Sequence, residues 1–205
     1  MIERKNEKPP EHFPIEFYRS HPSTMSNNTY VIGLDSGTMN AAIVVAQVIK
    51  EYHPKRNYYK IVEFIYPEKE MRNLTSDEKL LFLANLIWDL CMKYNVLAIT
   101  FEMLPLTTVG PKKLKGVLLA HSMTAITELI CACLDIKHCP IPVTTIKYYV
   151  TKNGDAKKEQ VQQCVDKLLE YQYSDIILGN DHIADALAVL HTYMCLYFQK
   201  DVKQE

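Results

Sequence analysis

The chain has 205 residues, of which 48% are hydrophobic and 23% are charged, and its formal net charge is −1. This length and this balance are typical of one globular domain with a substantial core, and they exclude a fibrous or largely disordered protein. A net charge near zero also argues against a protein that coats nucleic acid through bulk positive charge, although it allows a local basic surface.

No apolar run in the sequence looks long enough to cross a bilayer, and residues 1–10 are charged and lack the apolar segment of a secretory signal. We therefore expect no membrane partner and an intracellular, cytoplasmic location, which would be the host cytoplasm for a viral protein. The six cysteines show no paired Cys-x-x-Cys spacing. They are predicted to be reduced, mostly buried thiols rather than zinc ligands or disulfides.

The first half of the chain predicts an extension followed by a sheet. Residues 1–28 mix prolines, histidines and charges without a sustained period, so they are predicted to be a partly disordered N-terminal extension to a folded domain at 29–200. Two β-branched runs, at 29–35 and 41–49, are joined by a tight, Gly-containing turn and predict a hairpin. With a third strand at 58–66, they form an antiparallel meander.

The second half alternates helices with strands. Residues 75–78 form a capping box, and helical spacing of apolar residues follows to about residue 93. The apolar run at 96–102 is typical of a central parallel strand. A loop is then predicted at 103–115, and the later elements are a helix at 116–134, a strand at 140–143, at least one helical turn within 144–151, and amphipathic helices at 155–171 and 181–198.

The resulting order, β-β-β-α-β-α-β-α-α, predicts an α/β fold. Its sheet has five strands, three antiparallel and then parallel ones, with helices on both sides. Asp35 ends the first strand and Glu102 ends the fourth. If these strands are adjacent and parallel, the two acids share the sheet edge at which α/β proteins bind ligands.

The start of the last helix carries two further polar side chains. Asn180 or Asp181 is a suitable N-cap, and Ile183, Leu187, Leu190 and Met194 form one apolar stripe. His182 and Asp185 are three residues apart and lie together on a different face. Taken alone they could be surface residues near the helix dipole, just as Asp35 could be a turn residue and Glu102 a salt-bridge partner of a lysine.

Together, these acids would surround one small volume. Carboxylates in such a place repel one another, which raises their pKa values or demands a cation. Oxygen ligands of this kind suit Mg²⁺ or Mn²⁺.

Four blocks, in this order, resemble the RuvC-type Holliday junction resolvases. They are Gly-Leu-Asp-Ser-Gly-Thr at 33–38, Ala-Ile-Thr-Phe-Glu at 98–102, Lys147 followed by residues 154–161, and Asp-His-Ile-Ala-Asp-Ala-Leu-Ala at 181–188. The resemblance covers about residues 31–194 and implies the ribonuclease H-like fold. The first block alone also occurs in actin-like ATPases that share this core.

The resemblance implies a role for each matching residue. The metal-binding catalytic residues would be Asp35, Glu102, His182 and Asp185. Of these, His182 takes the family's fourth catalytic position, where the family has either Asp or His. Lys147 and Lys158 would contact DNA near the cleaved phosphate. The segment at 103–115 would enter the junction, although Pro105 and Leu106 depart from the aromatic residue often found there. This segment carries three more candidate DNA-binding lysines: Lys112, Lys113 and Lys115.

The implied reaction is hydrolysis of a phosphodiester. Two divalent ions, about 3.5–4 Å apart, would activate a water and stabilise the leaving 3′ oxygen, which gives a 5′ phosphate. Resolving a four-way junction needs two matched cuts, so a homodimer is expected. Val117, Met123 and Ile126 could supply its interface, but the same stripe suits the core, which we prefer for most of them.

Other functions stay open at this stage. The same nuclease site could act on flaps, forks or RNA-containing duplexes, and a catalytically silent branched-DNA-binding protein could share the fold. An actin-like phosphotransferase would need further Gly-rich phosphate loops, and the six glycines of the chain offer no candidate beyond residues 35–38. The unusual extension suits a viral or phage enzyme as well as a cellular one.

Overall fold

The computed structural model describes residues 28–36, 41–49, 59–104, 111–172 and 180–198. The predicted N-terminal extension lies outside the described residues, except for Asn28. The elements, in chain order, are β1 (Tyr30–Asp35), β2 (Ala42–Val48), β3 (Tyr59–Ile65), α1 (Glu68–Met71), α2 (Ser76–Lys93), β4 (Val96–Glu102), α3 (Pro111–Leu134), β5 (Lys137–Ile141), α4 (Val143–Thr151), α5 (Lys158–Gln172) and α6 (Asp181–Phe198).

The strands form one mixed sheet in the order β3-β2-β1-β4-β5. β1 is antiparallel to β2, and β2 to β3, whereas β1 with β4 and β4 with β5 are parallel pairs. The predicted sheet of three antiparallel strands followed by parallel ones is thereby confirmed. Because β1 and β4 are parallel neighbours, Asp35 and Glu102, their last residues, lie at the same edge of the sheet.

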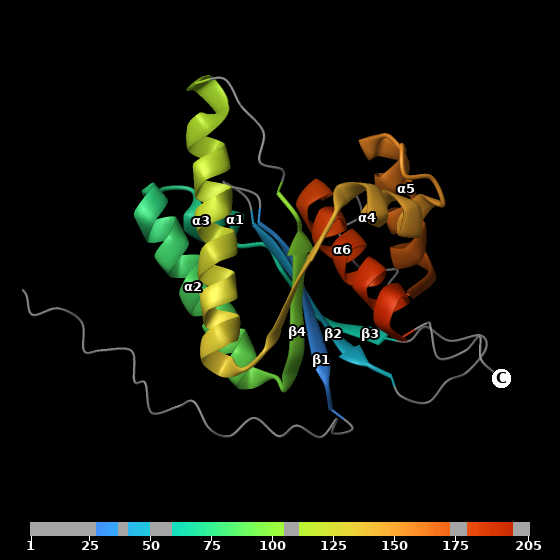
Figure 1. Ribbon diagram of the computed structural model, residues 1–205, viewed down its shortest axis with the longest axis horizontal. Coiled ribbons are helices and arrows are strands. Elements are labelled where there is room, and N and C mark those ends of the chain that lie inside the picture. Colours follow the sequence, from blue (N-terminus) through green and yellow to red (C-terminus); the bar gives the residue numbers. More distant parts are fainter. Residues whose placement is uncertain (1–27, 37–40, 50–58, 105–110, 173–179, 199–205) are drawn as a thin grey trace, which may run out of the picture.

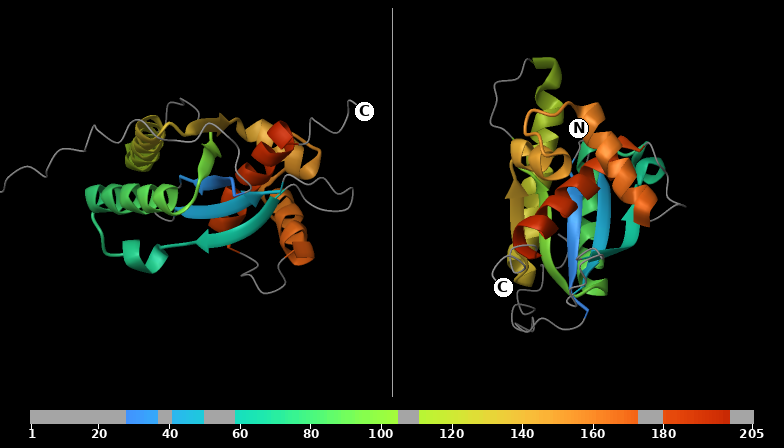
Figure 2. Two further views of the ribbon diagram at one scale, coloured as in Figure 1. Left: turned by 90° about the horizontal axis from the view of Figure 1, so that it is seen from below. Right: turned by 90° about the vertical axis from the view of Figure 1, so that its right-hand side faces the viewer.

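Helices cover both faces of the sheet, as predicted (Figures 1 and 2). On the side of α2 and α3, one core contains Ile32 of β1 and Phe101 of β4. On the side of α4, α5 and α6, a second core contains Val31 of β1 and Ala98 of β4. Since successive side chains of a strand point to opposite faces, the uninterrupted apolar runs of β1 and β4 supply two separate cores.

Gly33 lets α6 lie directly on the central strand. A Cβ atom at this position would lie 2.5 Å from the carbonyl oxygen of Ala186 and 2.6 Å from Cβ of Leu190. Both residues belong to α6, so the helix crosses β1 at a distance that only glycine permits. Because Ala186 directly follows Asp185, this contact also holds the start of α6 near the end of β1.

Several boundaries differ from the prediction. α3 begins at Pro111 rather than at residue 116, because proline is well suited to the first position of a helix; Lys112, Lys113 and Lys115 therefore belong to a helix and not to a loop. β5 spans Lys137–Ile141 rather than 140–143. It is an edge strand whose first residues are polar and exposed, so its sequence lacks the apolar pattern of a buried strand.

Two further helices, α1 and α5, also differ from the prediction. α1 was not predicted, and its four residues are too few to show a helical period. α5 begins at Lys158, not at residue 155, because Asp155 belongs to the preceding turn, where its backbone N–H donates to Oδ1 of Asn153.

One helix is apolar and long enough, by length and composition, to cross a membrane, which the sequence prediction did not expect. It is the 19-residue segment Gly116–Leu134 of α3, in which an 18-residue window has a mean hydropathy of 1.8. Polar residues such as His121 and Glu128 interrupt the apolar run, so the sequence prediction did not identify this segment. In the fold, α3 packs against α2, β4 and β5, and Met123 on its inner side is 2% exposed.

The six cysteines are free thiols, as predicted. Only two of them are fully buried, whereas the other four are partly exposed. Burial raises the pKa of Cys91 and of Cys131 to about 12, so both stay protonated in the core between α2 and α3.

Candidate active site

The start of α6 is held in place by Asn180. Its side-chain Oδ1 accepts hydrogen bonds from the backbone N–H groups of His182 at 3.0 Å and Ile183 at 3.1 Å. Asn180 is therefore the N-cap, one of the two residues predicted for this role. The predicted apolar stripe is buried as well, from Ile183 through Leu187 to Met194. The cap and the stripe together fix which way the first turn of α6 presents its polar side chains.

His182 meets the end of β1. Its Nδ1 donates a hydrogen bond of 2.8 Å to Oδ2 of Asp35, across 147 residues of sequence. The side chains are 31% and 18% exposed, so both are half-buried rather than enclosed in the core. When Nδ1 carries the proton of a neutral imidazole, the ring's lone pair is on Nε2.

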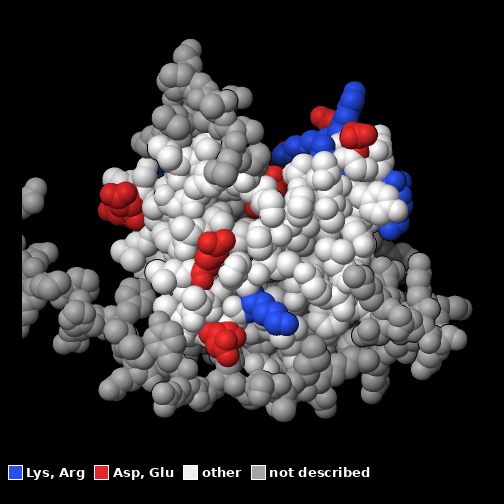
Figure 3. All heavy atoms as spheres, in the orientation of Figure 1, with Lys and Arg blue, Asp and Glu red and all other residues white. Residues whose placement is uncertain are grey.

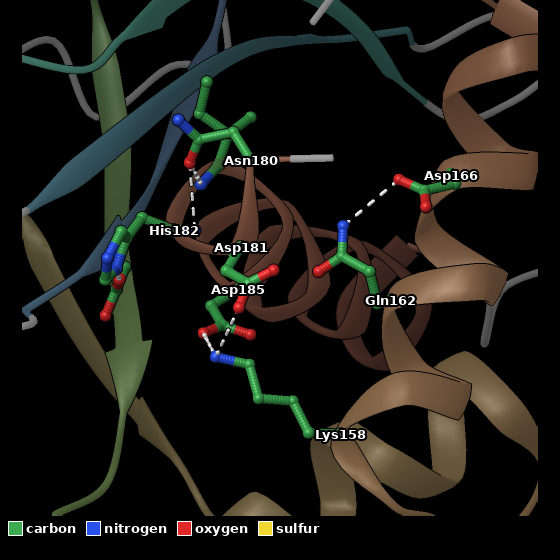
Figure 4. A network of polar contacts seen from close by, with 9 residues as sticks. Lys158, Gln162, Asp166, Asn180, Asp181, His182 and Asp185 are labelled. Carbon is green, nitrogen blue, oxygen red and sulfur yellow. Dashed lines mark hydrogen bonds and ion pairs between the residues drawn. The ribbon is translucent and has the colours of Figure 1, made fainter. Parts of the chain in front are cut away.

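Asp185 and Asp181 share a cation from α5. Nζ of Lys158 lies 3.3 Å from Oδ2 of Asp185 and 3.4 Å from Oδ2 of Asp181 (Figure 4). Burial lowers the pKa of Lys158, but the two carboxylates outweigh this effect and raise it above its ordinary value. Lys158 is therefore a firmly charged ammonium at the start of α6. The role of Asp181 as a partner of this lysine, rather than as the cap, follows from the same contacts.

Glu102 and Asp185 carry the electrostatic signature of a crowded site. Burial raises the pKa of Glu102, and the charges of Asp185 and Asp35 raise it further, while Lys147 and Lys158 act in the opposite direction. Burial likewise raises the pKa of Asp185, opposed by Lys158 and reinforced by Asp35. A carboxylate whose pKa is raised by two others lies close to both, so these acids face a common volume. The structure thus brings together all four predicted acid and histidine positions, with two of the predicted lysines.

The side chains of the other three predicted lysines lie outside the part of the chain that the structure describes. Lys112, Lys113 and Lys115 lie in the first turns of α3, where the backbone but not the side chains is described. Residues 105–110 of the predicted junction loop also lie outside the described residues. Their contact with DNA stays a prediction.

The surface around the site is mixed in charge. Viewed as in Figure 1, acidic side chains are partly recessed near the upper part of the molecule, and basic side chains lie next to them over α4 and α5 (Figure 3). Lys158, with its side chain 55% exposed, joins the two kinds of surface. A polyanion could therefore approach the recess from the lysine side despite the net charge of −1.

Tyr66 adds a residue to the site that the sequence did not indicate. Its ring stacks on the imidazole of His182, with 5.8 Å between the centroids and 16° between the planes. Partial burial, with the charges of Glu68 and Asp35, raises the pKa of Tyr66, so the phenol is uncharged at neutral pH. Nothing in the local sequence separates Tyr66 from an ordinary aromatic residue at the end of a strand.

The donor set fits a divalent cation in its chemistry. Among the residues that the structure describes, no group of three or more His, Cys, Asp or Glu side chains is arranged as the ligands of a metal ion. Instead, Asp35 accepts a hydrogen bond from His182, and Asp185 forms an ion pair with Lys158. These partners compensate part of the negative charge of the site. The charges of Asp185 and Asp35 raise the pKa of Glu102, which indicates that the site favours further positive charge. Carboxylate oxygens are the ligands that Mg²⁺ and Mn²⁺ prefer.

The fold and the site define a class of protein. A five-stranded mixed sheet of this order, with acids at the ends of the first and fourth strands and at the start of the last helix, is that of the ribonuclease H-like nucleases. The sequence model of one family, crossover junction endodeoxyribonuclease RuvC, matches residues 31–193. The chain belongs to the RuvC family of crossover junction endodeoxyribonucleases, whose members are generally dependent on divalent metal ions.

Solved structures agree with this fold. Thermus thermophilus RuvC, in complex with a Holliday junction substrate, matches with a TM-score of 0.63 and 16% identity over 84% of this chain and 95% of that chain. The yeast mitochondrial Holliday junction resolvase Ydc2 matches with a TM-score of 0.61 and 13% identity over 89% and 84%.

A viral structure is similar as well. The fowlpox virus resolvase, in complex with its substrate Holliday junction DNA, matches with a TM-score of 0.51 and 15% identity over 85% of this chain and 99% of that chain. Comparison with curated proteins finds no match to this chain. The likeness to resolvases is thus one of family pattern and fold.

Proposed function

We propose that this protein is a metal-dependent, structure-selective DNA endonuclease that resolves four-way junctions by paired hydrolysis and leaves 5′-phosphate ends. One observation carries the proposal: Asp35, Glu102, His182 and Asp185, from two strand ends and a helix start, lie close together beside Lys147 and Lys158. The fowlpox and Thermus relatives, whose structures contain Holliday junctions, support the choice of substrate.

The four acid and histidine side chains would hold Mg²⁺ or Mn²⁺, two ions per site, which supply Lewis-acid activation of the phosphate and of the attacking water. The remaining chemistry belongs to the chain itself. His182, with Nδ1 bonded to Asp35, has only the Nε2 lone pair left, which would either ligate one of these ions or orient the attacking water. Lys158 and Lys147 neutralise charge that develops on the phosphate oxygens.

The direct test is cleavage of a synthetic four-way junction. Purified protein with Mg²⁺ should nick two opposed strands, and DNA ligase, which requires a 5′ phosphate, should reseal the nicks. Asp185→Asn should bind the junction with little change in Kd but should cut at least about 1,000-fold more slowly. Cutting by this variant at the wild-type rate, or binding by the wild type without cutting, would overturn the proposal.

The substrate preference needs its own comparison. Flaps, replication forks and RNA-containing duplexes, each labelled on every strand, should be tested beside the four-way junction under the same Mg²⁺ concentration. Faster cutting of the junction in paired strands supports a resolvase. A faster reaction on any of the others would instead make this protein a nuclease for that substrate.

A second copy of the chain would supply the second cut, and the outer side of α3 fits this role. Exposed residues recur there at alternating spacings of four and three and none is charged: Leu118, Ser122, Ala125, Leu129 and Ala132. Leu118 and Leu129 are 57% and 61% exposed. This period is that of a helix–helix seam, and a two-fold axis through it would pair α3 with its counterpart.

Of the residues considered from the sequence for this interface, Met123 is buried in the core, whereas Val117 and Ile126 are half-buried. Leu129→Glu should turn a dimer into a monomer in analytical ultracentrifugation and should uncouple the two cuts. Leu81→Glu, an equally exposed position on α2, is the matched control and should leave the dimer intact. A wild-type monomer, or a dimer that survives Leu129→Glu, would contradict the assignment of this surface.

A further inference from the structure

Tyr66 contacts the histidine of the candidate site. Nδ1 of His182 donates a hydrogen bond of 2.8 Å to Oδ2 of Asp35. A hydrogen bond in the plane of the ring positions the nitrogen, whereas a contact on the face of the ring restricts rotation of the plane about that bond. The near-parallel ring of Tyr66, 16° from the imidazole plane, restricts that remaining motion.

The chain holds Tyr66 firmly enough for this task. Tyr66 directly follows β3, whose last residue, Ile65, is paired with Ile43 of β2. It directly precedes Pro67, which is buried and is the N-cap residue of α1. The ring thus projects from a junction between a strand and a helix, and not from a long loop, so its position is set by the sheet that also carries Asp35.

The contact also joins two parts of the site across the sheet. Asp35 belongs to the central strand β1, whereas Tyr66 follows the edge strand β3, two positions away in the sheet order. His182 enters from α6 between them and contacts both. The imidazole therefore has a partner on its edge and another on its face, which come from different strands.

We propose that Tyr66 is a positioning residue for the nuclease reaction: its ring holds the plane of the His182 imidazole while Asp35 holds Nδ1. This inference rests on the proposed function, because it assigns a role within that reaction. The aromatic face performs this role, and the hydroxyl is dispensable. Tyr66 itself touches no reacting atom.

Three variants of the full chain separate the ring from the hydroxyl. Tyr66→Phe keeps the stacked face, and its kcat on the four-way junction should stay within about twofold of wild type; Tyr66→Leu removes the face and should lower kcat about tenfold with little change in KM. Tyr66→Met serves as a second aliphatic variant if Tyr66→Leu does not fold. Tyr30→Leu, which removes a ring in tilted contact with Tyr94 at the other end of β1, is the matched control and should leave kcat unchanged.

A double-mutant cycle with His182→Ala shows whether Tyr66 acts through the histidine. In the His182→Ala background, Tyr66→Leu should cost less than about twofold, because the imidazole that it positions is already gone. A full further tenfold loss would overturn the proposal, as would unchanged kcat in Tyr66→Leu. An equal loss in Tyr66→Phe and Tyr66→Leu would also overturn it, because the hydroxyl would then be the group that matters.

A measurement without DNA keeps this inference separate from the proposed function. In the NMR spectrum of the metal-free protein, the ring current of Tyr66 should shift the Cε1–H signal of His182, assigned with His182→Gln. Tyr66→Leu should remove this shift and Tyr66→Phe should keep it, while the signal of His191, which contacts Tyr59, should stay in place. An unmoved His182 signal would refute the stack, whereas a failure to cut any branched DNA would refute only the proposed function.

Discussion

Two glutamates of the same sheet, Glu63 and Glu102, have opposite electrostatic surroundings. Glu63 of β3 accepts hydrogen bonds from Nζ of Lys93 at 2.8 Å and from the hydroxyl of Tyr94 at 2.6 Å. These donors at the end of α2 outweigh burial and lower the pKa of Glu63. Glu102 of β4 is more deeply buried, faces two other carboxylates, and has a raised pKa.

The difference teaches how to tell a structural acid from one that serves a reaction. Around Glu63, which with Lys93 and Tyr94 forms what we call the β3–α2 clamp, each charge has a matching partner, so the arrangement stabilises the fold by itself. Around Glu102, the negative charges exceed the nearby positive ones, which costs stability unless a cation binds. Such uncompensated charge in a recess marks a functional site.

The largest expected effect is on activity. Glu102→Gln should lower the rate of junction cutting at least about 1,000-fold, because it removes a metal-binding carboxylate. Glu63→Gln, the same change in the clamp, should stay within about twofold of wild type. Single-turnover cutting of the four-way junction measures both, and comparable losses in the two variants would erase the distinction between the regions.

The next effect concerns the contact that holds the site together. Gly33→Ala should lower the free energy of unfolding by about 2–3 kcal/mol, because the new Cβ overlaps Ala186 and Leu190 of α6. Gly154→Ala is the control, since a Cβ there would meet only the carbonyl oxygen of Thr144, at an ordinary 3.5 Å. Urea unfolding monitored by circular dichroism compares them, and equal stabilities would mean that α6 can move away from β1 freely.

The two glutamates should also respond to pH with opposite signs. Burial and neighbouring carboxylates hold the folded pKa of Glu102 above its ordinary 4.5, so ionised Glu102 destabilises the fold at neutral pH. This cost shrinks as the pH falls through the raised pKa and is absent below 4.5. The folded pKa of Glu63 is below 4.5, so its stabilisation is present above that value and is lost as the pH falls through the lowered pKa.

Glu102→Gln should therefore be more stable than wild type at neutral pH, and Glu63→Gln less stable. Both differences should shrink on acidification, the first one at a higher pH than the second. Thermal unfolding across this range, in metal-free buffer, provides the measurement. A Glu102→Gln variant that is less stable than wild type at neutral pH would show that the acid has a structural partner after all.

The smallest effect tests a single hydrogen bond of the clamp. Tyr94→Phe removes the hydroxyl that donates to Glu63 but keeps the ring that contacts Tyr30. The free energy of unfolding should fall by about 1 kcal/mol, the usual loss for one hydrogen bond to a partly exposed carboxylate. Junction cutting should not change, and any loss beyond about twofold would link the clamp to the site.

Much of the fold could be predicted because its signals are local. The capping box of α2, with Thr75 and Glu78 bonded reciprocally, and the apolar run of β4 have the bounds or nearly the bounds that the sequence predicts. The meeting of Asp35, Glu102, His182 and Asp185 followed from the rule that parallel strands end at one edge. Their proximity is confirmed, whereas their catalytic roles stay predictions.

The rest depends on contacts that no local pattern contains. The stack of Tyr66 on His182 joins residues from β3 and α6, and the close crossing at Gly33 is seen only when both elements are in place. The first residues of β5 were not predicted as a strand because they are polar. An edge strand pairs on one side only, so its sequence need not show the apolar pattern of a buried strand. The early start of α3 was hidden by Pro111, which breaks a helix anywhere except at its first turn.

The hydrogen bond between His182 and Asp35 has a consequence for the order in which the protein gains activity. It spans 147 residues of sequence, and α6 packs on β1 and β2 rather than on nearby elements alone. Forming contacts of such long range costs the entropy of closing a large loop. A molecule in which α6 is not packed on the sheet would contain Asp35 and Glu102 but no complete site, so activity depends on the docking of the last helix.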